Sequence, residues 1–67
     1  MKTFINRMKE LRTNRNLTQK ELAAMLKICH NTVSNWENGK QLPKLHQVIA
    51  LAKLYNVKCN YLLGLED

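Results

Sequence analysis

Four polar side chains recur at helical spacing near the middle of the chain: His30, Asn31, Ser34 and Asn35. Residues three and four positions apart are neighbours on a helix surface, so a helix over residues 30–38 places these groups on one face. Imidazole and amide groups donate and accept hydrogen bonds, and a hydrophobic core requires none of the four. From the residues alone, two interpretations stay open for this face: groups that hydrogen-bond a polar partner, or side chains that only keep the surface soluble.

A short helix is predicted immediately before this polar face. Thr18, with Glu21 three residues later, is typical of a capping box, in which each side chain satisfies a backbone donor at the start of a helix. Leu22, Met25 and Leu26 then recur at helical spacing, and we expect them to form the buried face.

The following helix, over residues 30–38, has an apolar side made by Val33 and Trp36. Gly39 is expected to end it, because glycine tolerates the left-handed conformation found at many helix C-termini. Ala23 is small enough to lie where the two helices cross. Residues 18–38 are therefore predicted to form a helix-turn-helix core, a motif whose second helix enters the major groove of DNA.

Composition and charge restrict the class of protein. The 67 residues suffice for one small domain, expected over 1–67, and 45% hydrophobic residues are ordinary for a globular chain. The net charge of +6 suits a phosphate-rich partner or an anionic membrane surface. No apolar run approaches the roughly 20 residues of a membrane span, and the start does not resemble a signal peptide. We therefore expect a cytoplasmic protein without a membrane partner.

An amphipathic helix is predicted at the start of the chain, over residues 3–14. Its apolar stripe consists of Phe4, Met8 and Leu11, with Ile5 beside them. Its other side carries Arg7, Lys9, Arg12 and Arg15. For each of these cations two interpretations stay open at this point, a contact with a phosphate-rich partner or a solvated surface.

Two more helices are predicted after Gly39. The first is expected to be the most buried, because it repeats apolar residues at Leu45, Val48, Ile49, Ala52 and Tyr55, with Leu51 and Leu54 beside them. Asn56 is expected to end it in the left-handed conformation. A short last helix over 58–63 brings the total to five, and the predicted fold class is all-α.

Four phrases of the sequence carry a resemblance to a known family: MKELR, LTQKELAAML, TVSNWENGK, and LAKLYNV followed by YLLG. In this order and spacing, from about Arg7 to Gly64, the chain resembles the phage-repressor and Cro-like helix-turn-helix proteins, also called the xenobiotic-response-element type. The resemblance implies a compact five-helix, lambda-repressor-like domain. It also implies sequence-specific binding of double-stranded DNA as a transcriptional regulator, most often a repressor, of a bacterium or phage.

The resemblance assigns roles residue by residue. The positions that reach base edges are Cys29, His30, Asn31 and Asn35. The positions that bind DNA phosphates are Gln19, Thr32, Asn38, Lys40 and Lys44. Arg12 and Glu37 match an internal ion pair that links the first helix to the end of the third. Because no arginine faces the bases, we expect a site in which A·T pairs and DNA shape matter.

Members of this family usually bind palindromic operators as two-fold dimers, so the resemblance implies a homodimer. We expect the dimer surface at the end of the last helix, formed by Tyr61, Leu62, Leu63 and Leu65, which exceed what a small core needs. The alternative is that Leu62 and one neighbour simply close the core.

Three residues depart from the family pattern, and one of them, Lys58, replaces a preferred capping residue before the last helix. Lys27 replaces the glycine common at the turn between the second and third helices, which predicts some backbone strain there. Cys29 replaces a serine or threonine cap and weakens the start of the third helix.

Other functions are less well supported. The sequence has no paired carboxylates and no glycine-rich phosphate loop, so we expect neither an enzyme nor a cofactor nor a small-molecule ligand. The spacing of Cys29, His30, His46 and Cys59 matches no recognised metal site. Cys29 is either a redox-sensitive thiol at a helix start or an inert capping residue.

The remaining alternative is an antitoxin or another protein-interaction module with the same fold. Antitoxins of this family usually add a segment that binds the toxin, and only residues 65–67 follow the predicted helices. This observation favours DNA binding.

Overall fold

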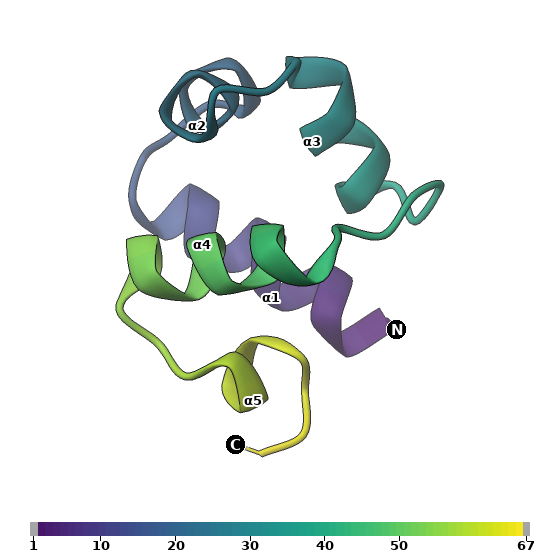
Figure 1. Cartoon of the computed structure of the whole chain (residues 1–67), viewed down its shortest axis with the longest axis vertical. Helices are drawn as coiled ribbons and strands as arrows, with labels where there is room; N and C mark the ends of the chain where they lie inside the picture. Colours follow the sequence, from purple (N-terminus) through teal and green to yellow (C-terminus); the bar gives the residue numbers. More distant parts are fainter. Residues whose placement is uncertain (1, 67) are drawn as a thin grey trace.

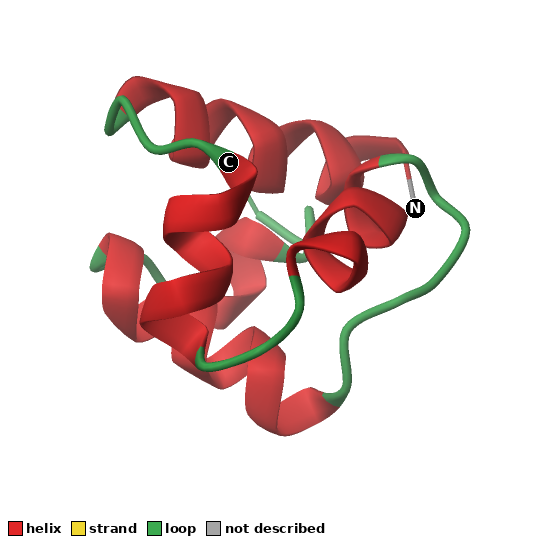
Figure 2. Ribbon diagram, turned by 90° about the horizontal axis from the view of Figure 1, so that it is seen from above, coloured by secondary structure: helices red, strands yellow, loops and turns green. Residues whose placement is uncertain are grey.

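The computed structural model describes residues 2–66 and shows five helices and no strand among them (Figure 1). The elements are α1 (Lys2–Asn14), α2 (Gln19–Leu26), α3 (His30–Glu37), α4 (Leu45–Tyr55) and α5 (Cys59–Leu62). The predicted all-α, five-helix fold is confirmed. Figure 2, turned by 90°, shows that loops alone connect the helices.

The helices enclose one hydrophobic core. In Figure 1, α2 and α3 lie on one side of α1 and α4, and α5 lies on the other. The core residues are Phe4, Met8, Leu22, Ala23, Val33, Trp36, Val48, Leu51, Ala52, Tyr55 and Leu62. Trp36 is the largest of the side chains that are less than 2% exposed, and it lies on the inner side of α3 with Val33, as predicted. Burial of these two residues turns the polar side of α3 outward.

Three residues predicted to be buried are exposed: Met25, Leu45 and Ile49. The buried residues of α2 are Leu22 and Ala23, with Leu26 partly buried against the core. At about 100° per residue, Met25 lies outside the arc that these three span. The buried stripe of α4 is Val48, Leu51, Ala52 and Tyr55, and it leaves Leu45 and Ile49 on the adjacent surface.

Each helix is followed within two residues by a residue in the left-handed conformation: Asn16, Lys27, Gly39, Asn56 and Gly64. After α2, the N–H of Lys27 donates to the carbonyl of Ala24 at 3.2 Å, and the N–H of Ile28 donates to the carbonyl of Ala23 at 3.0 Å. This pair of bonds is the Schellman motif, which satisfies carbonyls that a helix end leaves without donors. The motif makes a tight turn between α2 and α3.

The predicted capping box at the start of α2 is present. The N–H of Glu21 donates to Thr18 Oγ1 at 3.0 Å, and the N–H of Thr18 donates to Glu21 Oε1 at 2.9 Å. Hydrogen bonding to the carboxylate by Thr18, first by its backbone N–H and then by its side chain, lowers the pKa of Glu21, because it favours the charged form. The N-cap of α3, Cys29, makes no side-chain capping bond, as predicted.

Lys27 has φ 59° and ψ 45°, a conformation that costs an L-residue roughly 1–2 kcal/mol. We expect Lys27→Gly to raise the free energy of unfolding by about 0.5–1 kcal/mol, since glycine avoids the strain but loses more chain entropy. The measurement is chemical denaturation. Lys27→Ala is the matched control, because it removes the charge and keeps the strain. A gain of equal size in both variants would contradict the explanation.

The Tyr55 hydroxyl is buried without a hydrogen-bond partner. Burial is the main cause that raises its pKa from 10.0 to about 12, and the negative charge of Glu37 adds to it. We expect absorbance titration to show a phenol that ionises near pH 12 and is absent in Tyr55→Phe. Because the folded pKa lies above the unfolded value, stability is lost as the pH rises from about 10 to 12. A Tyr55→Phe variant that loses stability equally over this pH range would contradict the assignment.

Candidate nucleic-acid interface

The first turn of α3 presents the polar face predicted from the sequence. Cys29, His30 and Asn31 are exposed, whereas Thr32 and Asn35 are half-buried. The amide of Asn35 lies 3.5 Å from Gln41 Oε1, at the limit of a hydrogen bond. The exposed groups at the start of α3 are therefore available to an external surface.

The C-terminal half of α3 is hydrogen-bonded to the loop that follows it. The amide of Asn38 donates to Ser34 Oγ at 3.3 Å, one turn back along the helix. The backbone carbonyl of Asn35 accepts the N–H of Lys40 at 2.9 Å and that of Gln41 at 3.3 Å. Gly39 has φ 76°, and these bonds turn the chain so that Lys40 follows directly after the helix. The loop lysines Lys40 and Lys44 are both exposed.

The predicted ion pair between α1 and α3 is present. Arg12 Nε donates to Glu37 Oε2 at 2.7 Å, and a terminal nitrogen of Arg12 donates to Glu37 Oε1 at 2.9 Å. The other terminal nitrogen donates to the carbonyl of Leu17 at 2.7 Å. The two side chains are only 11% and 4% exposed, and the hydrogen bond to Glu37 raises the pKa of Arg12. This bidentate geometry fixes the end of α3 relative to α1 and the loop before α2.

Gln19 joins the same network from the first turn of α2. Its side-chain nitrogen donates to Glu37 Oε1 at 3.1 Å. One amide N–H is therefore committed to Glu37, while the second N–H and the amide oxygen are not. The bond fixes the direction of the Gln19 amide and links the first turn of α2 to the last turn of α3.

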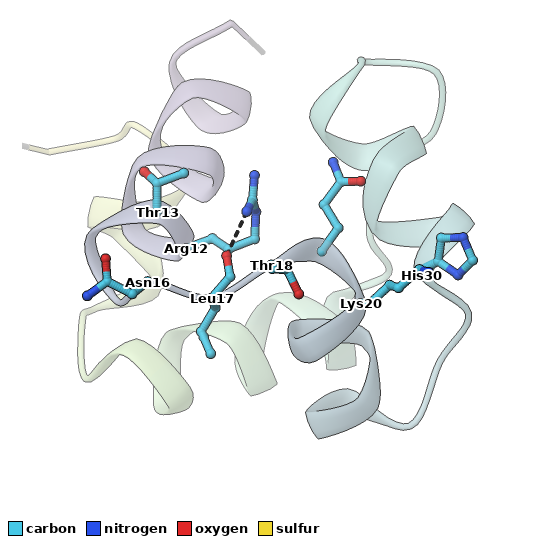
Figure 3. Close-up of a pocket in the computed structure, with 8 residues that line it drawn as sticks. Arg12, Thr13, Asn16, Leu17, Thr18, Lys20 and His30 are labelled. Atoms are coloured by element: carbon cyan, nitrogen blue, oxygen red, sulfur yellow. Dashed lines mark hydrogen bonds between the residues drawn. The ribbon is translucent and has the colours of Figure 1, made fainter.

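A groove of about 570 Å³ lies between the end of α1, the start of α2 and the start of α3 (Figure 3). Its lining residues are Arg12, Thr13, Asn16, Leu17, Thr18, Gln19, Lys20 and His30. A smaller groove of about 320 Å³ adjoins α3 and is lined by Lys20, Ala23, Ala24, Ile28, Cys29, His30 and Asn31. Lys20 and His30 line both grooves, and Gln19 lines the larger one. An amine, an imidazole and an amide therefore lie close together at the starts of α2 and α3.

Sequence reasoning missed Lys20. The residue lies one position after Gln19, and in the structure its side chain borders both grooves beside the start of α3. The sequence signals it only by its charge and by its place in the first turn of α2. That signal becomes informative only once the crossing of α2 and α3 is known.

The cationic side chains divide into two groups by residue type. All three arginines bond within the domain: Arg7 donates to the carbonyls of Tyr61 and Glu66, Arg12 pairs with Glu37, and Arg15 donates to the carbonyl of Tyr55 at 2.8 Å. All eight lysines are exposed. The cationic side predicted for the first helix is therefore partly structural, because each of its three arginines bonds to an acceptor within the domain. The lysines carry most of the exposed positive charge, to which the exposed side chain of Arg15 adds.

The structure changes the predicted dimer surface. Leu62 is 0% exposed and belongs to the core, so it is not available to a second copy. Leu63 packs partly against the core, and the guanidinium of Arg7 lies 4.1 Å from the centre of the Tyr61 ring. Of the four predicted residues, only Leu65 is largely exposed.

Within residues 2–66, no group of three His, Cys, Asp or Glu residues is placed to hold a metal ion. Both cysteines in this range, Cys29 and Cys59, are free thiols. No helix in the same range is long and apolar enough to cross a membrane.

Comparison with known proteins agrees with the geometry of α2 and α3. The model of the helix-turn-helix family matches residues 8–62. The chain belongs to this family. Membership confirms the resemblance inferred from the four sequence phrases, and it confirms that the domain is not an enzyme.

Three relatives illustrate the similarity. The chain is 41% identical over 61 residues to the transcriptional regulator ImmR of Bacillus subtilis, covering 91% of this chain and 48% of the relative. It is 41% identical over 54 residues to the cryptic phage CTXphi transcriptional repressor RstR of Vibrio cholerae, covering 81% and 49%. It is 34% identical over 64 residues to the transcriptional activator BcrR of Enterococcus faecalis, covering 96% and 31%. The chain thus spans half or less of the length of each.

Loss of the Arg12 side chain should leave Glu37 charged and buried beside Gln19 alone. We expect Arg12→Met to lower the free energy of unfolding by about 3 kcal/mol. The double variant Arg12→Met, Glu37→Met should recover much of this loss, because no charge then stays buried. Chemical denaturation of both variants tests the pair, and a single variant as stable as the wild type would show that the contact contributes nothing.

Proposed function

We propose that this domain binds double-stranded DNA sequence-specifically and regulates transcription as a repressor, with α3 in the major groove. The observation that carries the proposal is the exposed polar first turn of α3, oriented by the bonds that join Arg12 and Gln19 to Glu37. Membership of the helix-turn-helix family supports the proposal. The repressor role is supported by similarity to a protein that is itself named a repressor.

Base reading is assigned to the start of α3. Asn31 is exposed there, and its amide can bond N6 and N7 of adenine with two hydrogen bonds. His30 donates to a base or a phosphate, and Asn35 and Cys29 border the same surface. With no arginine on this face, the preferred operator is rich in A·T pairs next to the recognition helix.

Phosphate binding is assigned to the groups around α3. Gln19 and Lys20 lie at the start of α2, and Thr32 lies in the first turn of α3. Asn38, Lys40 and Lys44 follow at the other end, on or after the last turn of α3. Donors near both ends of the recognition helix fix its register along the major groove. The contacts to base edges then determine which sequence is preferred.

The domain is proposed to bind as a homodimer to a palindromic operator, because one short recognition helix contacts too few base pairs to select a site in a genome. Selection of bound duplexes from a random DNA library, followed by sequencing, tests this. An enriched palindrome supports the proposal. Salt-sensitive binding without any enriched sequence contradicts it.

Two substitutions separate base reading from phosphate binding. Asn31→Ala should relax the preference at one base position of the selected operator, at a cost of about 1–3 kcal/mol. Lys40→Ala should weaken binding to all DNA sequences alike and reduce the slope of log K against log salt concentration by about 1. Titrations of matched and mismatched duplexes at several salt concentrations measure both effects. If the two variants behave identically on these duplexes, the assignment of base readers is wrong.

A further inference from the structure

Asn35 lies one turn after Asn31 on the polar face of α3, and the loop that leads from α3 to α4 holds it at two points (Figure 1). Its backbone carbonyl accepts the N–H of Lys40 at 2.9 Å and that of Gln41 at 3.3 Å. Its side-chain nitrogen, Nδ2, donates to Gln41 Oε1 at 3.5 Å. Gln41 therefore contacts Asn35 through both its backbone and its side chain, and the two amide groups lie side by side.

The direction of the Asn35 amide decides which base edge it can read. With one N–H of Nδ2 donated to Gln41, the second N–H and Oδ1 are left, and they match N7 and N6 of adenine. In the reversed amide, Oδ1 faces Gln41 and accepts from its side-chain nitrogen, which leaves both N–H groups to the DNA. Two donors match O6 and N7 of guanine instead.

We propose that Gln41 is a positioning residue for base recognition. By accepting the hydrogen bond from Asn35 Nδ2, it holds the Asn35 amide in the direction that reads adenine and discriminates against guanine. The inference rests on the proposed function, and it adds a loop residue that selects the base without contacting it. The backbone bonds from Lys40 and Gln41 to the carbonyl of Asn35 keep the acceptor in place.

The length and exposure of this bond separate its effect on recognition from its effect on folding. Gln41 is exposed and Asn35 is half-buried, so in the free protein water replaces a bond of 3.5 Å at little cost. Against DNA, water is displaced from the amide pair, and a donor or acceptor left without a partner there costs more. Loss of the Gln41 side chain should therefore change the choice of base and leave the stability of the domain unchanged.

The test compares two duplexes that differ at the position read by Asn35. Selection from a random DNA library with the wild type and with Asn35→Ala identifies that position as the one whose preference is lost in the variant. The first probe is the enriched operator, and the second carries G·C in place of A·T at that position of each half-site. The ratio of the two affinities is the readout, because a change of charge at residue 41 alters both affinities alike.

For the wild type we expect a preference for adenine of at least about tenfold. Gln41→Ala should reduce this ratio by about threefold, and should reduce it no further when Asn35 is already alanine. Gln41→Glu should keep the wild-type ratio, because a carboxylate can only accept the bond from Asn35 Nδ2. Both Gln41 variants should unfold at the denaturant midpoint of the wild type.

Lys40→Ala is the matched control. Its backbone N–H still bonds the carbonyl of Asn35, so the variant keeps the loop and removes only a neighbouring side chain. It should weaken binding to both duplexes and leave the ratio of their affinities unchanged.

Several outcomes overturn the inference. If Gln41→Ala weakens both duplexes equally, Gln41 binds phosphate, and if it relaxes a different position, Gln41 reads a base itself. A wild-type preference for guanine, or loss of the ratio in Gln41→Glu, shows that the Asn35 amide does not face the DNA as proposed. An Asn35→Ala variant with every preference intact removes Asn35 as a reader. All of these results leave the proposed function intact when an operator has been enriched. If no sequence is enriched, the proposed function fails and the inference fails with it.

Discussion

The orientation of α3, and with it the proposed recognition surface, depends on one buried contact, the bidentate pair between Arg12 and Glu37. The pair joins the end of α3 to α1, and through Gln19 and the carbonyl of Leu17 it also joins the loop and first turn of α2. Small domains bury little surface, so the orientation of a two-turn helix is not fixed by packing alone. A charged pair with all its principal donors and acceptors engaged supplies the missing constraint, because every alternative position leaves a buried carboxylate unpaired.

The cationic side chains differ in how far they bond within the domain. Arginine has a planar group that bonds several acceptors at once, and each of the three arginines is used to hold parts of the domain together. Lysine is a strongly hydrated point charge, and all eight lysines are exposed. Most of the exposed positive charge is thus separated from the positive charge that maintains the fold, although Arg15 is exposed and also bonds within the domain. The net charge alone does not reveal this division.

Local sequence signals were most informative at the helix ends. The capping box of Thr18 and Glu21 and the left-handed residues Gly39 and Asn56 follow from residue type and spacing, since each reports a local hydrogen-bonding need. The strain at Lys27 follows only from its departure from the family pattern. Burial was predicted less well. The periodicity of α4 includes Leu45 and Ile49, and that of α2 includes Met25, yet all three are exposed. A helix with apolar residues on more than one face does not specify which face meets the core.

By itself, the sequence determined the five helices, their ends, the outward polar face of α3 and, through resemblance, the partner of Arg12, because these follow from local periodicity, capping and family motifs. The tertiary structure alone decided which of the available groups lie together. It brought Lys20 beside His30, committed Arg7 and Arg15 to backbone carbonyls, placed Leu62 in the core and left Leu45 and Ile49 exposed. Each of these depends on how helices far apart in the chain cross, and that geometry is set by the packing of the whole core.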